Sequence, residues 1–346
     1  MEKKFLWGTV GQGASMLNRL TFPVQKDNGT IIRFDTSLGT DNLGDYIIMH
    51  YCGKVLDEMF PGHKTINIGS HLMPTDEQEQ TVKQIKYKFV CGTNLLTSNI
   101  EHHWRWILPD GVRRKMNYRN VILLGAGWGE YQGECSDYSQ MIYRTMLNPC
   151  VLHSVRDQYT LEKLHNAGFK NVINTGCPTT WALTPEFCKE IPEKKAKEVV
   201  TTITDYRRDP DRDNEMLAIL SRNYDHVYLW LQGRHDGEYL QTLNAPANLT
   251  TIPASLEAYE EVLCKGGVDY VGTRLHAGIH ALNHKIRSII LAVDNRATEM
   301  GRDVNLLVIQ RRAISEELEQ KINSDFATEI RINQQNIDRF KAQFRR

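Results

Sequence analysis

Residues 269–276 read DYVGTRLH, a short apolar run that ends at a glycine and passes directly into a helical pattern. Residues 151–158, VLHSVRDQ, repeat this form in the first half of the chain. Both runs are continuously apolar rather than alternating, which is typical of parallel strands covered on both faces. A strand that leads through a tight turn into a helix is the unit of an α/β fold, so the two segments predict one parallel sheet in each half.

Similar runs extend this pattern in both directions. We predict strands at residues 31–34, 65–68, 88–91, 121–124, 151–155 and 171–173, and then at 199–203, 227–231, 269–272 and 288–293. Helical patterns lie between them, with further helices at 45–60, at 255–264 and at the end of the chain from residue 333. The polar, charged segment 186–197 suits a linker. The expected architecture is therefore an N-terminal domain, 1–185, and a C-terminal domain, 198–346, with the last helix in the second and a cleft between them.

Composition excludes several classes of protein. Forty-two basic side chains offset forty-two acidic ones, so no overall charge draws the chain to nucleic acid, and any anion site must be a local cluster. The seven cysteines form no CxxC pair and are expected to be reduced thiols. No run approaches the ~20 apolar residues of a membrane span. These features predict a cytoplasmic protein and leave peripheral contact with a membrane open. Residues 1–29 precede the first strand and look like an extra segment.

Glycine-bearing loops follow several of the predicted strands. Residues 39–45, GTDNLGD, lead straight into a helix, where free N–H groups favour an anion or a polar ligand. A simple turn capped by Asn42 or Asp45 explains this loop as well. After the third strand, Gly92 allows close backbone approach and Asn94 offers both a donor and an acceptor. Residues 124–129, LGAGWG, form a third exit of this kind.

In each half of the chain, an arginine directly follows a predicted strand. Arg156 follows a first-half strand, with Asp157 as its local partner or as the cap of the next helix. Arg274 has no acidic neighbour in sequence and stands two residues before His276 at a predicted helix start. A guanidinium at the end of a buried strand needs an anionic partner, so Arg274, His276 and the adjoining Gly272 and Thr273 predict a phosphate or carboxylate cradle. A surface arginine beside a core histidine is the alternative.

Histidine spacing raises two further possibilities. His276, His280 and His284 recur every four residues on one predicted helix face, a spacing that suits a metal. No glutamate stands in the place that a zinc-protease motif needs, so packing or solvent roles are expected for the last two, and we predict no metal. His102 and His103, beside Trp104 and Trp106, fit either a sugar-stacking surface or ordinary packing.

Taken in order, these motifs resemble the polysaccharide pyruvyl transferase family. The matching pieces are residues 39–45, 92–96, 154–157 with 159–164, and 274–276. Residues 292–296, AVDNR, look like the family's segment after a late strand, with Arg296 where a lysine is usual. Two departures are the extra first 29 residues and a second glycine segment in which Cys91 and Thr93 flank Gly92.

The resemblance implies two Rossmann-like domains arranged as in GT-B glycosyltransferases. It implies phosphoenolpyruvate as donor substrate, no cofactor, and a sugar or glycan acceptor, lipid-linked or free, that becomes a pyruvate ketal. Arg156, Arg274 and His276 would form the donor site, on the C-terminal side, with His276 as the proton donor. The first domain would hold the acceptor near Asn42, Asp45, Gly92, Asn94 and His103, and Asp41, Asp45 and His103 are candidates for its base. A glycosyltransferase that uses a sugar nucleotide, and a silent member that binds a glycan or a partner, are the alternatives.

Overall fold

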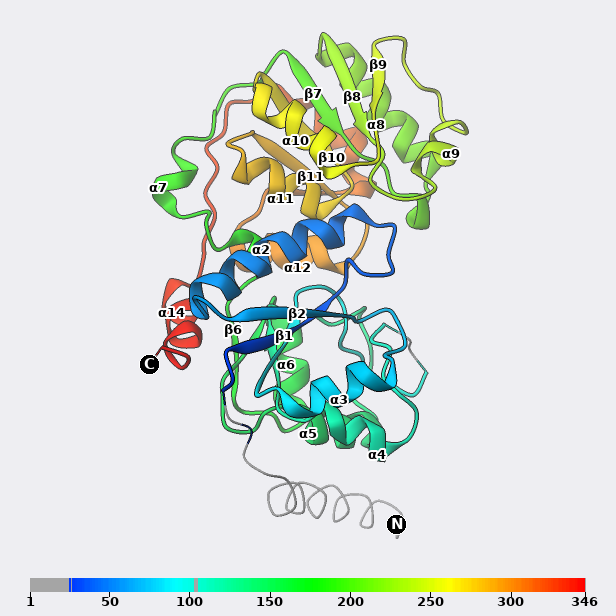
Figure 1. Ribbon diagram of the computed structural model, residues 1–346. Helices are drawn as coiled ribbons and strands as arrows, with labels where there is room; N and C mark the ends of the chain where they lie inside the picture. The colour runs from blue at the N-terminus through cyan, green and yellow to red at the C-terminus, as the bar shows by residue number, and fades with distance from the viewer. Residues whose placement is uncertain (1–24, 26, 103–104, 346) are drawn as a thin grey trace. The chain divides into compact units, whose positions relative to one another are not determined.

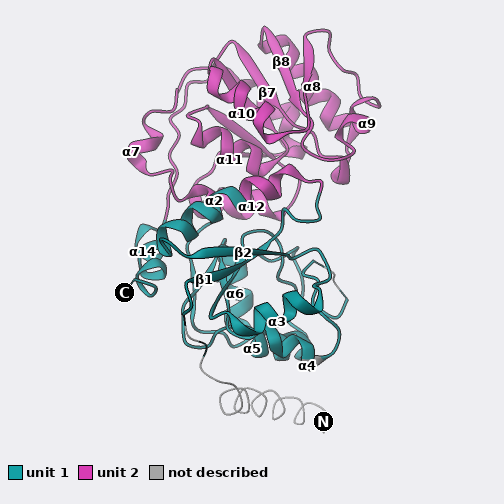
Figure 2. Ribbon diagram, in the orientation of Figure 1, with its two compact units in different colours: residues 1–40, 49–178, 333–346 teal, residues 41–48, 179–332 magenta. Residues whose placement is uncertain are grey.

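The computed structural model describes residues 25, 27–102 and 105–345 of the chain. It divides into two compact units, which Figure 2 shows in different colours. Unit 1 consists of residues 1–40, 49–178 and 333–346, and unit 2 of residues 41–48 and 179–332. Within the described ranges, no helix is long and apolar enough to cross a membrane.

Unit 1 is built on parallel strands joined through helices (Figure 1). Its elements are β1 (Thr30–Asp35), α2 (Leu43–Met59, which begins in unit 2), β2 (Lys64–Gly69), α3 (Asp76–Gln84), β3 (Tyr87–Cys91), α4 (Val112–Lys115), β4 (Val121–Leu124), α5 (Asp137–Met146), β5 (His153–Val155), α6 (Gln158–Asn166), β6 (Val172–Asn174) and α14 (Gln334–Ala342). The strands form a sheet in the order β2-β1-β3-β4 and a pair β5-β6. A parallel bridge between Ala126 and Val155 connects the two.

Unit 2 contains a six-stranded parallel sheet in the order β12-β11-β10-β7-β8-β9. Its elements are α7 (Pro185–Cys188), β7 (Glu198–Thr201), α8 (Pro210–Asn223), β8 (His226–Trp230), α9 (Asp236–Leu240), β9 (Leu249–Ile252), α10 (Leu256–Lys265), β10 (Val268–Gly272), α11 (Leu275–Asn283), β11 (Ser288–Ala292), α12 (Asn295–Val304), β12 (Val308–Gln310) and α13 (Glu319–Ile322). The strand order reverses between β7 and β10, as in doubly wound folds, where ligands bind beyond the strand ends.

Local sequence explains why these elements begin where they do. Thr75 caps α3 and exchanges bonds with Gln78 in a capping box, while Asp157 and Ser255 accept backbone N–H bonds at the starts of α6 and α10. Inner strands such as β3, β10 and β11 are almost entirely buried, whereas the edge strands β2, β9 and β12 are partly exposed. Each unit has a hydrophobic core of its own. The predicted α/β class with Rossmann-like parallel sheets is confirmed.

The division of the chain differs from the sequence prediction at residues 41–48, which cluster with unit 2, at the linker and at the last helix. The chain passes from unit 1 to unit 2 at residues 178–179, whereas residues 186–197, predicted as a linker, lie inside unit 2 and include most of α7. The predicted C-terminal domain loses its last helix, because α14 belongs to unit 1. Phe344 packs against Phe60 and Phe89 there, with ring centroids 5.5 and 5.6 Å apart, and aromatic burial of this kind outweighs proximity along the chain.

Candidate functional site

The strand ends of unit 1 bring together three of the predicted loops and the exit of β6. β3, β4 and β5 are neighbours, so the segments that follow them, 92–96, 125–129 and 156–157, leave the same edge of the sheet. Backbone hydrogen bonds tie them to one another: Gly127 N donates to Thr93 O at 2.8 Å, and Arg156 N donates to Ala126 O at 3.0 Å. The β6 exit continues this edge through Thr175 N, which donates to Val155 O.

Arg156 lies at the centre of this edge and is almost completely buried, with 1% of its surface exposed. Its Nε donates to Asp157 Oδ2 at 3.1 Å, and Asp157 also caps α6 through a 2.7 Å bond from Thr160 N. Both terminal nitrogens, Nη1 and Nη2, are buried without a hydrogen-bond partner among the described residues. A buried cation with two unused donors is costly unless an anion completes it.

Glycine at position 127 is required by the arginine. A Cβ built on Gly127 would stand 2.3 Å from Arg156 Cζ and Nη2, far inside contact distance. Gly92 has a left-handed backbone, with φ of 54°, and the following Thr93 shares it, with φ of 48°. The Oδ1 atom of Asn94 is buried and has no hydrogen-bond donor in the described structure. The predicted loop residues Gly92 and Asn94 therefore lie at the same strand edge as Arg156.

Arg274 has the opposite surroundings in unit 2. It precedes α11 at the end of β10, and its Nη2 contacts Asp236 Oδ1 at 2.6 Å and Asp205 Oδ1 at 2.9 Å. Its Nε donates to Ile203 O at 2.9 Å. Burial opposes the charge of Arg274, yet the carboxylates, led by that of Asp236, raise its pKa above the ordinary value. The absence of an acidic neighbour in sequence was a misleading signal, because both aspartates arrive from the exits of other strands.

Tyr206 and Arg296 extend this cluster. The guanidinium of Arg274 lies over the Tyr206 ring, 5.0 Å from its centroid, and Tyr206 Oη accepts a 2.7 Å bond from Arg296 Nη2. Arg296 also contacts Asp294, which caps α12. Three carboxylates thus accompany two guanidinium groups at this edge of unit 2. Sequence reasoning missed Asp205, Tyr206 and Asp236, and their only shared signal is their position just after β7 and β8.

The other predicted donor residues of unit 2, His276, Gly272 and Thr273, are buried. His276 is the second residue of α11 and 5% exposed. A Cβ on Gly272 would lie 2.5 Å from Thr202 Oγ1, and Thr273 N donates to Thr202 O, so both residues pack against the β7 exit. The grouping of His276 with Arg156 in one donor site stays a prediction, because the two belong to different units.

The loop at residues 39–45 divides between the units. Asn42 and Asp45, predicted on the acceptor side of the N-terminal domain, cluster with unit 2. Asn42 Oδ1 accepts from Gln232 Nε2 at 2.9 Å and from Gly44 N at 3.1 Å, and Asn42 Nδ2 donates to Asp45 at 3.3 Å. Asp41 is exposed and pairs with Arg234 at 3.2 Å. The assignment of this loop to the first domain is therefore corrected.

The aromatic surface expected near residue 103 is only partly described. His103 and Trp104 lie outside the described residues, and His102 is exposed. Trp106 is 3% exposed and packs edge-on against Phe34, with ring centroids 5.6 Å apart. Trp106 is therefore a core residue rather than an open stacking platform for a sugar.

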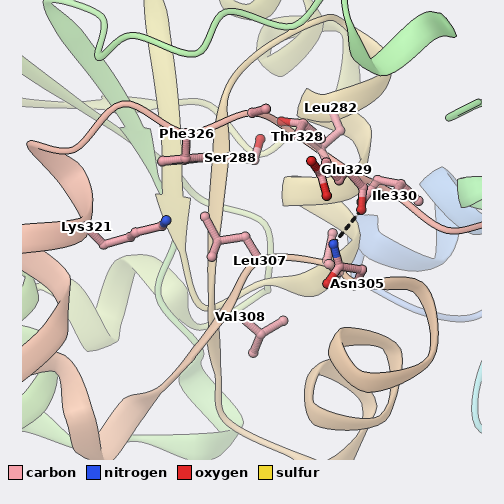
Figure 3. A pocket seen from close by; sticks show the side chains of 12 residues that line it. Leu282, Ser288, Asn305, Leu307, Val308, Lys321, Phe326, Thr328, Glu329 and Ile330 are labelled. Carbon is pink, nitrogen blue, oxygen red and sulfur yellow. Dashed lines mark hydrogen bonds between the residues drawn. The ribbon is translucent and has the colours of Figure 1, made fainter. Parts of the chain in front are cut away.

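A pocket of about 230 Å³ in unit 2 lies away from these loops (Figure 3). Ser288 and Val308, the first residues of β11 and β12, line it together with residues 326–330. Asn305 Nδ2 donates to Glu329 O at 2.7 Å across its rim. The pocket therefore sits at the amino ends of the strands, whereas the predicted donor residues of unit 2 follow the carboxyl ends.

Comparison with known proteins identifies a family for this chain. A search of curated proteins found no match. The family model described as polysaccharide pyruvyl transferase matches residues 42–295, which is well over half of the chain and includes the exits of β3, β4, β5, β10 and β11. The chain therefore belongs to the polysaccharide pyruvyl transferase family, a family of transferases.

Proposed function

We propose that this protein transfers the pyruvyl group of phosphoenolpyruvate to a sugar of a glycan or its precursor, forming a pyruvate ketal. The observation that carries the proposal is Arg156, a buried guanidinium with two unused donors at a glycine-lined strand edge. Two parallel N–H donors match the geometry of a carboxylate or phosphate, and phosphoenolpyruvate has one of each. Family membership supports the pyruvyl chemistry and a sugar or glycan acceptor.

We give the two arginines different roles in the proposed donor site. Arg274 already has two carboxylate partners, so we assign it the role of fixing the start of α11 and with it the position of His276. Arg156 becomes the main anion anchor. Each charge-assisted bond to the donor contributes about 1.5–3 kcal/mol.

In the proposed reaction, His276 gives a proton to the methylene carbon of phosphoenolpyruvate, which becomes the methyl group. A sugar hydroxyl attacks the adjacent carbon, forming a C–O bond and losing its proton to a base. The C–O bond to phosphate then breaks, and a second hydroxyl closes the ketal as it loses its own proton. The two hydroxyl protons balance the one placed on the methyl group and the one carried by hydrogen phosphate. General acid catalysis of this kind contributes roughly 10²–10⁴ in rate.

Arg156→Met tests the anchor directly. Calorimetric titration of phosphoenolpyruvate should show binding weakened by about 10–100-fold, equivalent to the loss of one charge-assisted interaction. Arg287 offers a matched control, since it is equally buried but its terminal nitrogens already contact Asp269 and backbone carbonyls. The folded fraction of Arg287→Lys should bind the donor as the wild type does. Unchanged binding by Arg156→Met would reject the assignment.

A donor screen separates the remaining alternatives. Release of phosphate from phosphoenolpyruvate in the presence of glycan acceptors supports the proposal, whereas release of a nucleoside diphosphate from a sugar nucleotide indicates a glycosyltransferase. Tight phosphoenolpyruvate binding without turnover on any glycan indicates a silent binding protein.

The proposal also includes a reducing compartment for the enzyme. Cys52, Cys91, Cys177 and Cys188 are buried free thiols, and such thiols persist in reducing compartments. We infer that the enzyme works in the cytoplasm, so protein denatured directly in the lysate should give seven free thiol groups on labelling.

A further inference from the structure

Two neighbouring helices of unit 2 bring together a set of metal-binding side chains. Glu260 projects from α10, His280 from α11, and His284 is the residue that ends α11. One ligand atom from each lies within 4.8 Å of the other two. Glu260 Oε1 is 3.2 Å from His280 Nε2, and the two imidazole rings have centroids 4.5 Å apart.

These distances suit a small transition-metal ion. Zinc bound tetrahedrally at about 2.0–2.1 Å places neighbouring ligand atoms about 3.3 Å apart, close to the Glu260–His280 separation. Two imidazoles and one carboxylate are an established zinc ligand set, with water in the fourth position. The His280–His284 spacing of four residues places both rings on one helix face.

A hydrogen bond to the backbone fixes the tautomer of the His284 ring. Its Nδ1 lies 2.9 Å from the carbonyl oxygen of His280, so Nδ1 carries the hydrogen and Nε2 is the basic nitrogen of the neutral ring. Histidines that bind metals commonly donate their other ring N–H to a carbonyl in this way.

The surrounding contacts hold the two helices in register. Tyr259, next to Glu260, donates from its hydroxyl to Ala277 O on α11 at 2.9 Å. Its ring stacks on Trp230 of β8, with centroids 4.1 Å apart and planes within 8°. Figure 1 shows α10 and α11 beside each other in unit 2. The three ligands are therefore presented by a packed scaffold rather than by a loop.

We propose that Glu260, His280 and His284 form a zinc site that joins α10 to α11. The site is separate from the proposed proton donor: the helix rises about 1.5 Å per residue, so His284 lies about 12 Å along α11 from His276. By joining the two helices, zinc would stabilise the helix that presents Arg274 and His276 at its other end. The proposal does not depend on the identity of the pyruvyl donor.

The test uses the full-length protein after treatment with a chelator. Competition against a chromophoric chelator should show one zinc ion bound per chain, with a rise in the thermal unfolding midpoint. Glu260→Gln and His284→Ala change half-buried side chains and leave the core intact. Each should weaken zinc binding by more than about 100-fold, beyond the cost of losing an outer hydrogen-bond partner, and abolish the stabilisation.

His235→Ala is the matched control. His235 and Glu238 form an exposed His–carboxylate pair at 3.1 Å, but no third ligand joins them in the metal-binding groups found among the described residues. This variant should bind zinc as the wild type does. Failure of the wild type to bind one equivalent, or wild-type affinity in both Glu260→Gln and His284→Ala, would overturn the proposal.

Cobalt substitution distinguishes the proposed ligands from a cysteine. Cys264 is exposed and stands one helical turn beyond Glu260 on α10. A nitrogen and oxygen ligand set gives visible ligand-field bands without an intense thiolate-to-metal charge-transfer band. That charge-transfer band, lost in Cys264→Ser together with the bound metal, would place the ion on the cysteine and contradict the site proposed here.

Discussion

Gly127 tests how closely the strand edge of unit 1 is fitted to Arg156. In Gly127→Ala the new Cβ would have to displace the guanidinium, which it approaches to 2.3 Å. Overpacking of this kind costs about 1–3 kcal/mol of unfolding free energy, and donor binding should fall with it. Urea unfolding and calorimetric titration measure the two effects. Gly133→Ala is the control, since nothing lies within 4 Å of its Cβ, and equal stability of the two variants would contradict the fit.

The buried amine of Lys88 predicts how the free energy of unfolding depends on pH. Burial, with a smaller contribution from Arg119, lowers its pKa from 10.5 to about 7. Between these values the unfolded chain keeps a proton that the folded protein has lost, so unfolding free energy rises with pH across the window and the benefit disappears as pH falls through 7. The slope is at most about 1.4 kcal/mol per pH unit.

Urea unfolding at several pH values between about 6.5 and 9 measures that slope. Lys88→Met removes the titrating amine and should remove the slope with it. An identical pH dependence in the two proteins would show that another group is responsible.

At the residue scale, the sequence singled out two arginines but did not predict their surroundings. Arg156 and Arg274 both follow a buried strand and precede a helix, and nothing local separates them. Their difference comes from the exits of other strands, which deliver Asp205 and Asp236 to Arg274 and leave two nitrogens of Arg156 without a protein partner. Such pairings depend on strand order, which hydrophobic periodicity does not encode. Glu260 escaped prediction for the same reason.

Helices and strands could be predicted where a local sequence pattern marks them. The run at residues 121–124 is β4 in the structure, and Ser255 caps α10 as its position before an apolar periodic segment suggests. The segment at 186–197 was wrongly predicted as a linker, because proline and charged residues are as common at a helix start as in a linker. Pro185 is the first residue of α7 and follows its cap, Thr184. Two strands were missed: Thr250 and Thr251 interrupt the apolar residues of β9, and β12 is only three residues long.

The packing of the last segment, α14 and Phe344, gives a prediction about the stability of unit 1. Phe344→Ala should lower the stability of unit 1 by about 3 kcal/mol, because its ring is 8% exposed among Phe60, Phe89 and Phe340. Hydrogen exchange should rise in β1 and β3 and leave β7–β12 unchanged. Phe326→Ala is the control in unit 2, where the ring contacts Arg287 and Lys321. Faster exchange in β10 and β11 of Phe344→Ala would contradict the assignment of α14 to unit 1.

At the scale of the whole molecule, the two units divide the chemistry unequally. In the proposed function, unit 1 supplies a buried guanidinium with spare donors, and unit 2 supplies His276 on a helix whose start is held by Arg274 and its two aspartates. Phosphoenolpyruvate should therefore slow hydrogen exchange most strongly at residues 92–96, 125–129 and 156–160. A ligand that binds the native state slows local opening in proportion to its occupancy, so this protection should saturate with the calorimetric dissociation constant.

Arg156→Met should lose that protection in unit 1, whereas inorganic phosphate added to the wild type should reproduce it if the anchor holds the phosphate group. Pyruvate should reproduce it if the anchor holds the carboxylate. Protection confined to residues 205–206 and 272–276, in both the wild type and Arg156→Met, would move the anion site to unit 2. In that case Arg274 would have to exchange its aspartates for the donor, and the conformational change required would itself appear as faster exchange around Asp236.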